Sequence, residues 1–176
     1  MAIEPDTKNW TWVLDDRCDE CGFDGPTVTF REVPTLVREN ARAWPAELTC
    51  DDVRDRPDDA TWSPLEYGAH VRDVFRKFEE RLVLMLAEDA PTFANWDQDV
   101  TAVEDRYAEQ DPAVVSAELF EAAERVAVAF EAVRDEDLGR TGLRSDGSAF
   151  TVETLARYFV HDPVHHLHDV RRTSAA

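Results

Sequence analysis

Residues 63–86 read SPLEYGAHVRDVFRKFEERLVLML and carry the clearest helix signal in the chain. Ser63, followed by Pro64 and then Glu66, forms a capping box with proline at the first helical position. Beyond this start, apolar residues recur every three or four positions, as they do along one face of an amphipathic helix. They are Tyr67, Val71, Val74, Phe75, Phe78, Leu82, Met85 and Leu86. The stretch therefore predicts a helix with one buried face.

Three further segments, residues 34–44, 112–137 and 151–172, show the same helical periodicity. The first of them ends where Pro45 interrupts the pattern, because proline lacks the N–H that a helix interior requires. Four amphipathic helices with almost no strand pattern predict an all-α fold, and specifically a four-helix bundle.

The first 33 residues differ from the rest, because they contain turn formers and no helical stripe. We expect residues 1–33 to form a short irregular amino-terminal arm packed on the bundle, anchored by Trp10, Trp12 and Phe23. Residues 34–176 are expected to form the bundle domain. A length of 176 residues fits a single domain of this kind.

The charge of the chain excludes several classes of partner. It has 38 acidic and 19 basic residues, which give a formal net charge of −19. Such a surface repels nucleic-acid phosphates and anionic lipids, so we expect neither nucleic-acid nor membrane binding. No apolar run approaches the roughly 20 residues that span a bilayer. Residues 1–8 are too polar for a secretory signal, so we expect a cytoplasmic protein.

The 5 histidines of the chain are unevenly placed, since four of them fall within residues 161–168. Residues four apart share one face of a helix, so His161 and His165 are expected to point the same way. His166 is rotated by about 100° from His165 and is expected to point elsewhere. His70 lies beside the apolar stripe of the helix at 63–86 and supplies a third nitrogen if the two helices are neighbours. Three histidines leave coordination positions open, as in a catalytic metal site.

Other interpretations of these histidines stay open. A single inward histidine is more often a hydrogen-bonded core residue than a ligand, and His168 competes for a ligand role. Pro163 lies between the paired histidines and clashes with the carbonyl of Phe159 in a regular helix. We therefore expect a kink just before or at His161.

Two helix motifs carry a resemblance to a known family. The first motif, at the start of the second helix, is Trp62-Ser63-Pro64 with Glu66 and His70. The second motif, in the last helix, is His161-x3-His165 followed by His166-Leu167-His168-Asp169-Val170. On these motifs the chain resembles the DinB-like superfamily, which includes mycothiol-dependent maleylpyruvate isomerases and bacillithiol-transferase-like proteins. The resemblance covers residues 34–172.

The resemblance implies an up-down-down-up bundle with a long crossover, which residues 91–110 fit. It also implies one divalent metal ion, with zinc before nickel or iron, held by His70, His161 and His165. Members of known activity use the ion to activate a thiol such as mycothiol or bacillithiol for transfer or isomerisation. A mycothiol-type thiol and a small electrophile are therefore the expected partners, and a homodimer is compatible with the sequence. A thiol bound to a cation loses its proton near neutral pH.

Two alternative functions stay open. One is a non-catalytic metal-binding protein of stress response or partner interaction, with a site closed by a fourth ligand such as His168 or Asp169. The other is metal-assisted hydrolysis, for which Asp97 or Asp162 is the first candidate for a carboxylate beside bound water.

Cysteines and connecting segments supply further candidates. Cys18 and Cys21 have the spacing of half a zinc site, and only Cys50 can add a third sulfur. We favour reduced structural cysteines over a second metal site or a redox pair. Residues in the connections are candidates for lining a substrate pocket, although ordinary loop packing explains each one individually: Trp96, Asp97, Arg106, Tyr107 and Arg144.

Overall fold

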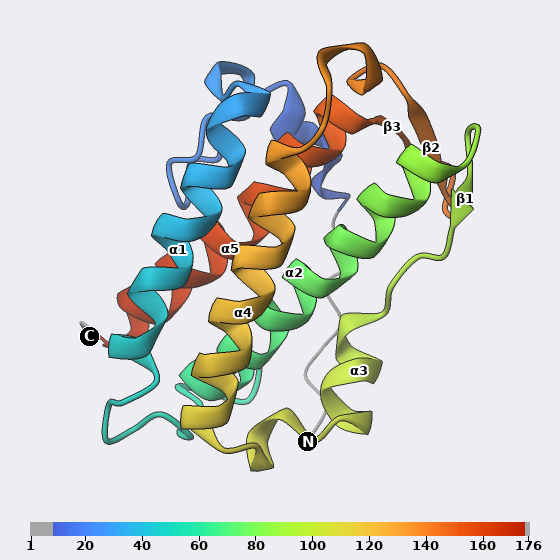
Figure 1. The fold of residues 1–176 in the computed structure, drawn as a ribbon. Coiled ribbons are helices and arrows are strands. Elements are labelled where there is room, and N and C mark those ends of the chain that lie inside the picture. The colour runs from blue at the N-terminus through green and yellow to red at the C-terminus, as the bar shows by residue number, and fades with distance from the viewer. Residues whose placement is uncertain (1–8, 175–176) are drawn as a thin grey trace.

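The computed structural model describes residues 9–174, and its main body is a bundle of four long helices (Figure 1). These helices are α1 (Val33–Glu47), α2 (Pro64–Ala87), α4 (Pro112–Glu131) and α5 (Val152–Ser174). Residues 1–8, on which the expectation about a secretory signal rests, lie outside the described part. Within residues 9–174, no helix has the length and apolar character needed to cross a membrane.

The four helices have the order that the family resemblance implies. Figure 1 shows α1 and α5 running in one direction and α2 and α4 in the other. Ion pairs between α2 and α4 confirm that these two helices are parallel, because the partners advance together along both. Arg72 pairs with Glu118 at 3.0 Å, and Glu79 pairs with Arg125 at 3.1 Å. Parallel neighbours need a long crossover. It contains β1 (Thr92–Phe93), α3 (Gln98–Glu104) and the 3-10 turn η4 (Tyr107–Glu109).

A small sheet corrects the expectation of an all-α fold. β1 pairs in parallel with β2 (Thr141–Arg144), and β2 pairs antiparallel with β3 (Ala149–Thr151). These strands are two to four residues long, too short for an alternating pattern to identify them. The sheet joins the crossover to the connection between α4 and α5 and closes one end of the bundle.

The predicted helix start at Ser63 is confirmed. The Ser63 N–H donates to Glu66 Oε2 at 2.9 Å, and the Glu66 N–H donates to Ser63 Oγ at 3.3 Å. Pro45 does not end α1 as the sequence predicts, since this helix continues to Glu47. α5 continues as one helix through Pro163, and the kink predicted near His161 stays a prediction. Buried contacts hold the middle of α5, where Asn40 Nδ2 of α1 donates to the Pro163 carbonyl at 2.7 Å.

Residues 9–32 pack along α5 as an irregular arm with three 3-10 turns: η1 (Trp10–Leu14), η2 (Gly25–Thr27) and η3 (Phe30–Glu32). Its inward side chains, Val13, Cys18, Phe23 and Phe30, are buried. Gly25 is required here, because a Cβ at this position would lie 2.0 Å from the Val13 carbonyl oxygen. The arm therefore covers one face of α5, and α2 covers another.

Candidate metal centre

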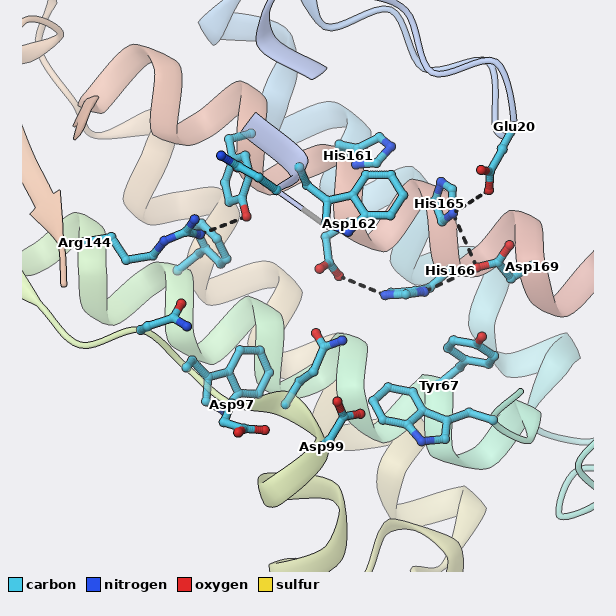
Figure 2. A pocket seen from close by; sticks show the side chains of 18 of the residues that line it. Glu20, Tyr67, Asp97, Asp99, Arg144, His161, Asp162, His165, His166 and Asp169 are labelled. Atoms are coloured by element: carbon cyan, nitrogen blue, oxygen red, sulfur yellow. Dashed lines mark hydrogen bonds and ion pairs between the residues drawn. The ribbon is translucent and has the colours of Figure 1, made fainter. Parts of the chain in front are cut away.

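A cavity of about 650 Å³ lies beside α2 and α5. Its walls come from both helices, the crossover, the β2–β3 turn and the arm (Figure 2). Polar and aromatic side chains line it, including Trp62, Tyr67, Arg81, Trp96, Arg144, Tyr158, Asp162 and His166. A cavity of this size and lining suits a small molecule.

Three potential metal ligands lie together beside this cavity, and two of them, Asp162 and His166, line it. His70 of α2 and Asp162 and His166 of α5 have ligand atoms that all lie within 4.8 Å of one another. His70 Nε2 is 3.3 Å from Asp162 Oδ1, and His166 Nε2 is 3.6 Å from the same oxygen. Asp162 and His166 are four residues apart, so the helix brings them to one face.

Unsatisfied polar atoms mark this cluster as a place for a cation. His70 is completely buried, yet neither of its ring nitrogens forms a hydrogen bond within residues 9–174. The buried Oδ1 of Asp162 also forms none there. Buried polar atoms normally have partners, because leaving them unpaired is costly. Two imidazoles and a carboxylate are ligands for zinc, nickel or ferrous iron, so the residues fit a divalent ion.

Aromatic rings hold the two imidazoles in place. The Trp96 ring stacks on His70 with centroids 5.4 Å apart and planes 8° apart, and Trp62 lies 5.2 Å from His70. Tyr67 packs against His166 at 5.0 Å. Trp62, Tyr67 and Trp96 also line the cavity, so the rings that contact the two imidazoles form part of its wall.

The protonation states expected near neutral pH suit metal binding. Burial lowers the pKa of His70, which favours the neutral imidazole. Burial alone would raise the pKa of Asp162, but the facing imidazoles of His166 and His70 lower it to about 2. A metal ligand must be neutral if it is an imidazole and ionised if it is a carboxyl group.

Asp169 supports the cluster from behind. Its Oδ2 lies 3.5 Å from His166 Nδ1, which leaves His166 Nε2 directed at Asp162. A carboxylate on the far nitrogen of a ligand histidine fixes the ring and its tautomer. Burial would raise the pKa of Asp169, but the hydrogen bond from His166 lowers it.

The predicted ligand set of His70, His161 and His165 stays a prediction, and the structure brings only two of the three residues together. His161 and His165 do lie together, with ring centroids 5.1 Å apart. Their potential ligand atoms cluster with Cys18 and Cys21 of the arm, and not with His70. All four residues of the two pairs line the same cavity, and Figure 2 shows His166 directed toward Asp162 and His165 directed toward Glu20 and Asp169. Asp162 and His166 each follow one of these histidines by one residue, which turns a side chain by about 100° around the helix.

The other predicted candidates divide between the cavity and ordinary packing. Trp96, Asp97 and Arg144 line the cavity. Tyr107 is buried and donates its hydroxyl to Asp73 Oδ2 at 2.7 Å, while Arg106 lies exposed, 3.7 Å from Glu109. His168 belongs to neither ligand cluster of the described residues.

Three residues of this candidate centre have other roles in the prediction from the sequence. The sequence indicates Asp162 as a candidate for hydrolysis and Asp169 as a candidate closing ligand, and it predicts that His166 points away from the histidine pair. The available signal was a second i, i+4 pair, Asp162-x3-His166, with the same spacing as the histidine pair.

Two arginines give the cavity a cationic end. Arg81 is buried, and its Nη2 donates to the Ala94 carbonyl at 3.3 Å, but its Nε has no hydrogen-bond partner among the described residues and no ion pair joins it to one of their carboxylates. Burial, followed by the nearby Arg144, lowers the pKa of Arg81 to about 10, so it stays charged at neutral pH. Arg144 contacts Asp146 at 2.7 Å and donates to the Tyr158 hydroxyl at 3.0 Å.

Comparisons with known proteins agree with this architecture. A family model described as the DinB superfamily matches residues 35–170. The fold is similar to that of YfiT from Bacillus subtilis, described as a probable metal-dependent hydrolase with an unusual four-helix bundle topology. The TM-score is 0.65 and the identity 18%, over 98% of this chain and 93% of that chain. At this identity the likeness establishes the fold alone. No curated protein matches the sequence.

Proposed function

Because the chain belongs to the DinB superfamily, we propose that it binds one divalent ion through His70, Asp162 and His166 and uses it in thiol transfer or isomerisation. The observation that carries this proposal is the convergence of three ligand residues, two of which have buried polar atoms without a hydrogen bond among the described residues, beside a cavity that Asp162 and His166 line. Zinc is the expected ion, with nickel and iron as alternatives.

Three protein ligands leave room for a further ligand, which a catalytic site needs and a structural site does not. The bound ion supplies Lewis acidity, which lowers the pKa of a coordinated thiol. The surrounding residues orient the ligands and keep water away from them. Asp169 orients His166, and Trp62 and Trp96 exclude water around His70. A cysteine-based thiol such as mycothiol, together with a small electrophile, is the substrate pair that we propose.

The cationic end of the cavity indicates the chemistry of the electrophile. Arg81 and Arg144 line the same cavity as Asp162 and His166. A guanidinium recognises carboxylates in bidentate fashion, and Arg81 has no described carboxylate partner within the chain. We therefore propose that the electrophile carries a carboxylate group, which Arg81 binds.

Metal-assisted hydrolysis is the second candidate, favoured by the description of YfiT. It needs a carboxylate free to act as a base on bound water. The two residues nominated for that role have other tasks here, because Asp162 is among the proposed ligands and Asp97 caps α3 by accepting from the Val100 N–H at 3.0 Å. Thiol activation by a cation needs no such base, which is why we place it first.

The ligand assignment predicts that His166→Ala loses one equivalent of metal per chain, because two ligands do not hold the ion tightly. Metal analysis of the purified full chain measures this. His168→Ala is the matched control, since His168 lies on the same helix outside both clusters. Unchanged metal content in His166→Ala would contradict the assignment.

The thiol part is tested with the cobalt-substituted protein. Titration with mycothiol is expected to change the cobalt spectrum of the wild type but not of His166→Ala, and to support conjugation to a carboxylate-bearing electrophile. Hydrolysis of an ester or amide without any thiol would favour the second candidate. A metal that responds to neither thiol nor substrate would favour the non-catalytic alternative.

A further inference from the structure

A second cluster of potential metal ligands lies where the arm meets α5. It contains Cys18 and Cys21 of the arm and His161 and His165 of the helix, and its ligand atoms all lie within 4.8 Å of one another. We propose that these four residues form a structural zinc site that fastens the arm to the bundle. The proposal is independent of the function proposed above, because the two sites share no ligand.

The distances fit a tetrahedral ion. Zinc lies about 2.3 Å from a thiolate sulfur and about 2.0 Å from an imidazole nitrogen, so a tetrahedral site places sulfur and nitrogen about 3.5 Å apart. Cys18 Sγ lies 3.6 Å from His165 Nδ1. The buried His161 Nε2 forms no hydrogen bond within residues 9–174, so it is available as a ligand. A Cys2His2 set is closed and leaves no position for substrate.

The backbone of residues 17–24 is folded to present both sulfurs. The Gly22 N–H donates to the Cys18 carbonyl at 2.8 Å, and the Cys18 N–H donates to the Phe23 carbonyl at 2.7 Å. Gly22 has φ +78°, a left-handed conformation that favours glycine. Arg17 and Asp24 form an antiparallel bridge at the base of this turn. The turn therefore holds Cys18 and Cys21 on the side that faces α5.

The far side of His165 carries the support that ligand histidines usually have. Its Nδ1 faces Cys18, while its Nε2 lies 3.5 Å from Glu20 Oε2 and 3.6 Å from Asp169 Oδ2 (Figure 2). A carboxylate on the non-ligating nitrogen directs the other nitrogen to the metal. Asp169 also contacts His166 of the first cluster, so one carboxylate orients a histidine of each site.

Charge and composition favour zinc at this position. Two thiolates neutralise the charge of a divalent cation, which lowers the energetic cost of burying the ion. Thiolate ligands also select zinc over magnesium or calcium. The alternative use of a Cys-x2-Cys pair, as a disulfide, would leave the buried His161 Nε2 without a partner. Both cysteines are free thiols here.

Cobalt substitution and X-ray absorption test the proposal on the intact chain. The cobalt-substituted wild type and His166→Ala are both expected to show a thiolate-to-cobalt charge-transfer band. The X-ray absorption spectrum of zinc-loaded His166→Ala should fit two sulfur and two nitrogen ligands. Retention of this site in a variant that lacks the first metal separates the two proposals. A zinc edge with no sulfur ligand would overturn the inference.

Cysteine variants identify the ligands. Cys18→Ser and Cys21→Ser are each expected to lose the charge-transfer band, whereas Cys50→Ser keeps it, because the Cys50 thiol donates to the Glu47 carbonyl at 3.0 Å away from the cluster. If the serine variants fail to fold, a mercurial titration of the wild type replaces them: modification of the buried thiols should release one zinc per chain and speed proteolysis within residues 9–32. Thiol modification without zinc release, or an oxidised Cys18–Cys21 pair in the intact mass, would overturn the proposal.

Discussion

Asp162 gives the candidate metal centre a different charge from the three-histidine set that the sequence indicated. Its carboxylate places one negative charge against the ion, with His70 Nε2 3.3 Å away and His166 Nε2 3.6 Å away. Asp169 adds a second carboxylate behind His166. At the scale of single residues, the site therefore depends on two acidic groups as much as on its imidazoles.

Asp169→Asn tests this support, because an amide has a weaker hold on the Nδ1 proton of His166. We expect metal affinity at the first site to fall by about 10–100-fold, as outer partners of ligand histidines typically contribute. Competition with a chromogenic chelator measures the change. Since Asp169 also faces His165, zinc release from the cysteine-containing site should become faster in the same variant. Unchanged affinity at both sites would contradict the assigned role.

Helix α5 carries two i, i+4 pairs that are offset by a single residue. His161 and His165 face the arm, while Asp162 and His166 face α2. Because consecutive residues are about 100° apart around a helix, one element serves two clusters on adjacent faces. Pro163 lies between the pairs without ending the helix, and its carbonyl accepts from Asn40 of α1.

Asp73 connects helix α2 to the crossover, and the two arginines bound to Asp73 also pair with Glu118 of α4. This carboxylate accepts from Arg72 Nη2 at 2.8 Å, from Arg76 Nη1 at 3.1 Å and from the Tyr107 hydroxyl at 2.7 Å. Burial alone would raise the pKa of Asp73, but the hydrogen bond from Arg72 and the charges around it lower it. A lowered pKa in the folded state means that ionised Asp73 stabilises the fold.

Asp73→Asn is therefore expected to lower the free energy of unfolding by about 1–3 kcal/mol at neutral pH. The contribution of ionised Asp73 is complete above its ordinary pKa of about 3.9 and is lost as the pH falls through the lower folded-state pKa. Urea unfolding of both proteins from pH 7 down through this range should show the difference shrinking below about pH 4. A difference that is the same at every pH would contradict the argument.

At the scale of the whole molecule, the parallel arrangement of α2 and α4 accounts for part of the cavity wall. Their direction requires the crossover that contains β1 and α3, and this crossover supplies Trp96 and Asp97 to the cavity wall. The arm covers α5 on the other side. Between them, the bundle interior is filled by aromatic rings, since Phe159 of α5 stacks on Phe130 at 5.6 Å and on Phe78 at 4.9 Å.

Phe159→Ala tests how much this aromatic core contributes to the stability of the fold. Phe159 is fully buried, so removal of its ring is expected to lower the free energy of unfolding by about 3–5 kcal/mol. Phe120→Ala is the control, because Phe120 of α4 is 45% exposed and its replacement should change stability by less than about 1 kcal/mol. Equal losses in the two variants, measured by chemical unfolding, would contradict the position of the core.

The amino-acid sequence by itself determined the helices, because their signals are local. The Ser63 cap, the apolar stripe of α2 and the four-residue spacing within residues 161–168 each act over one or two helical turns. The short strands were not determined in this way, since β1 and β2 identify one another only by pairing between Thr92 and Leu143, far apart in the chain. The choice between the pairs His161/His165 and Asp162/His166 was also tertiary. Both have the same spacing, and only the rotation of α5 about its own axis, set by its packing against α1, α2 and the arm, decides which pair faces His70.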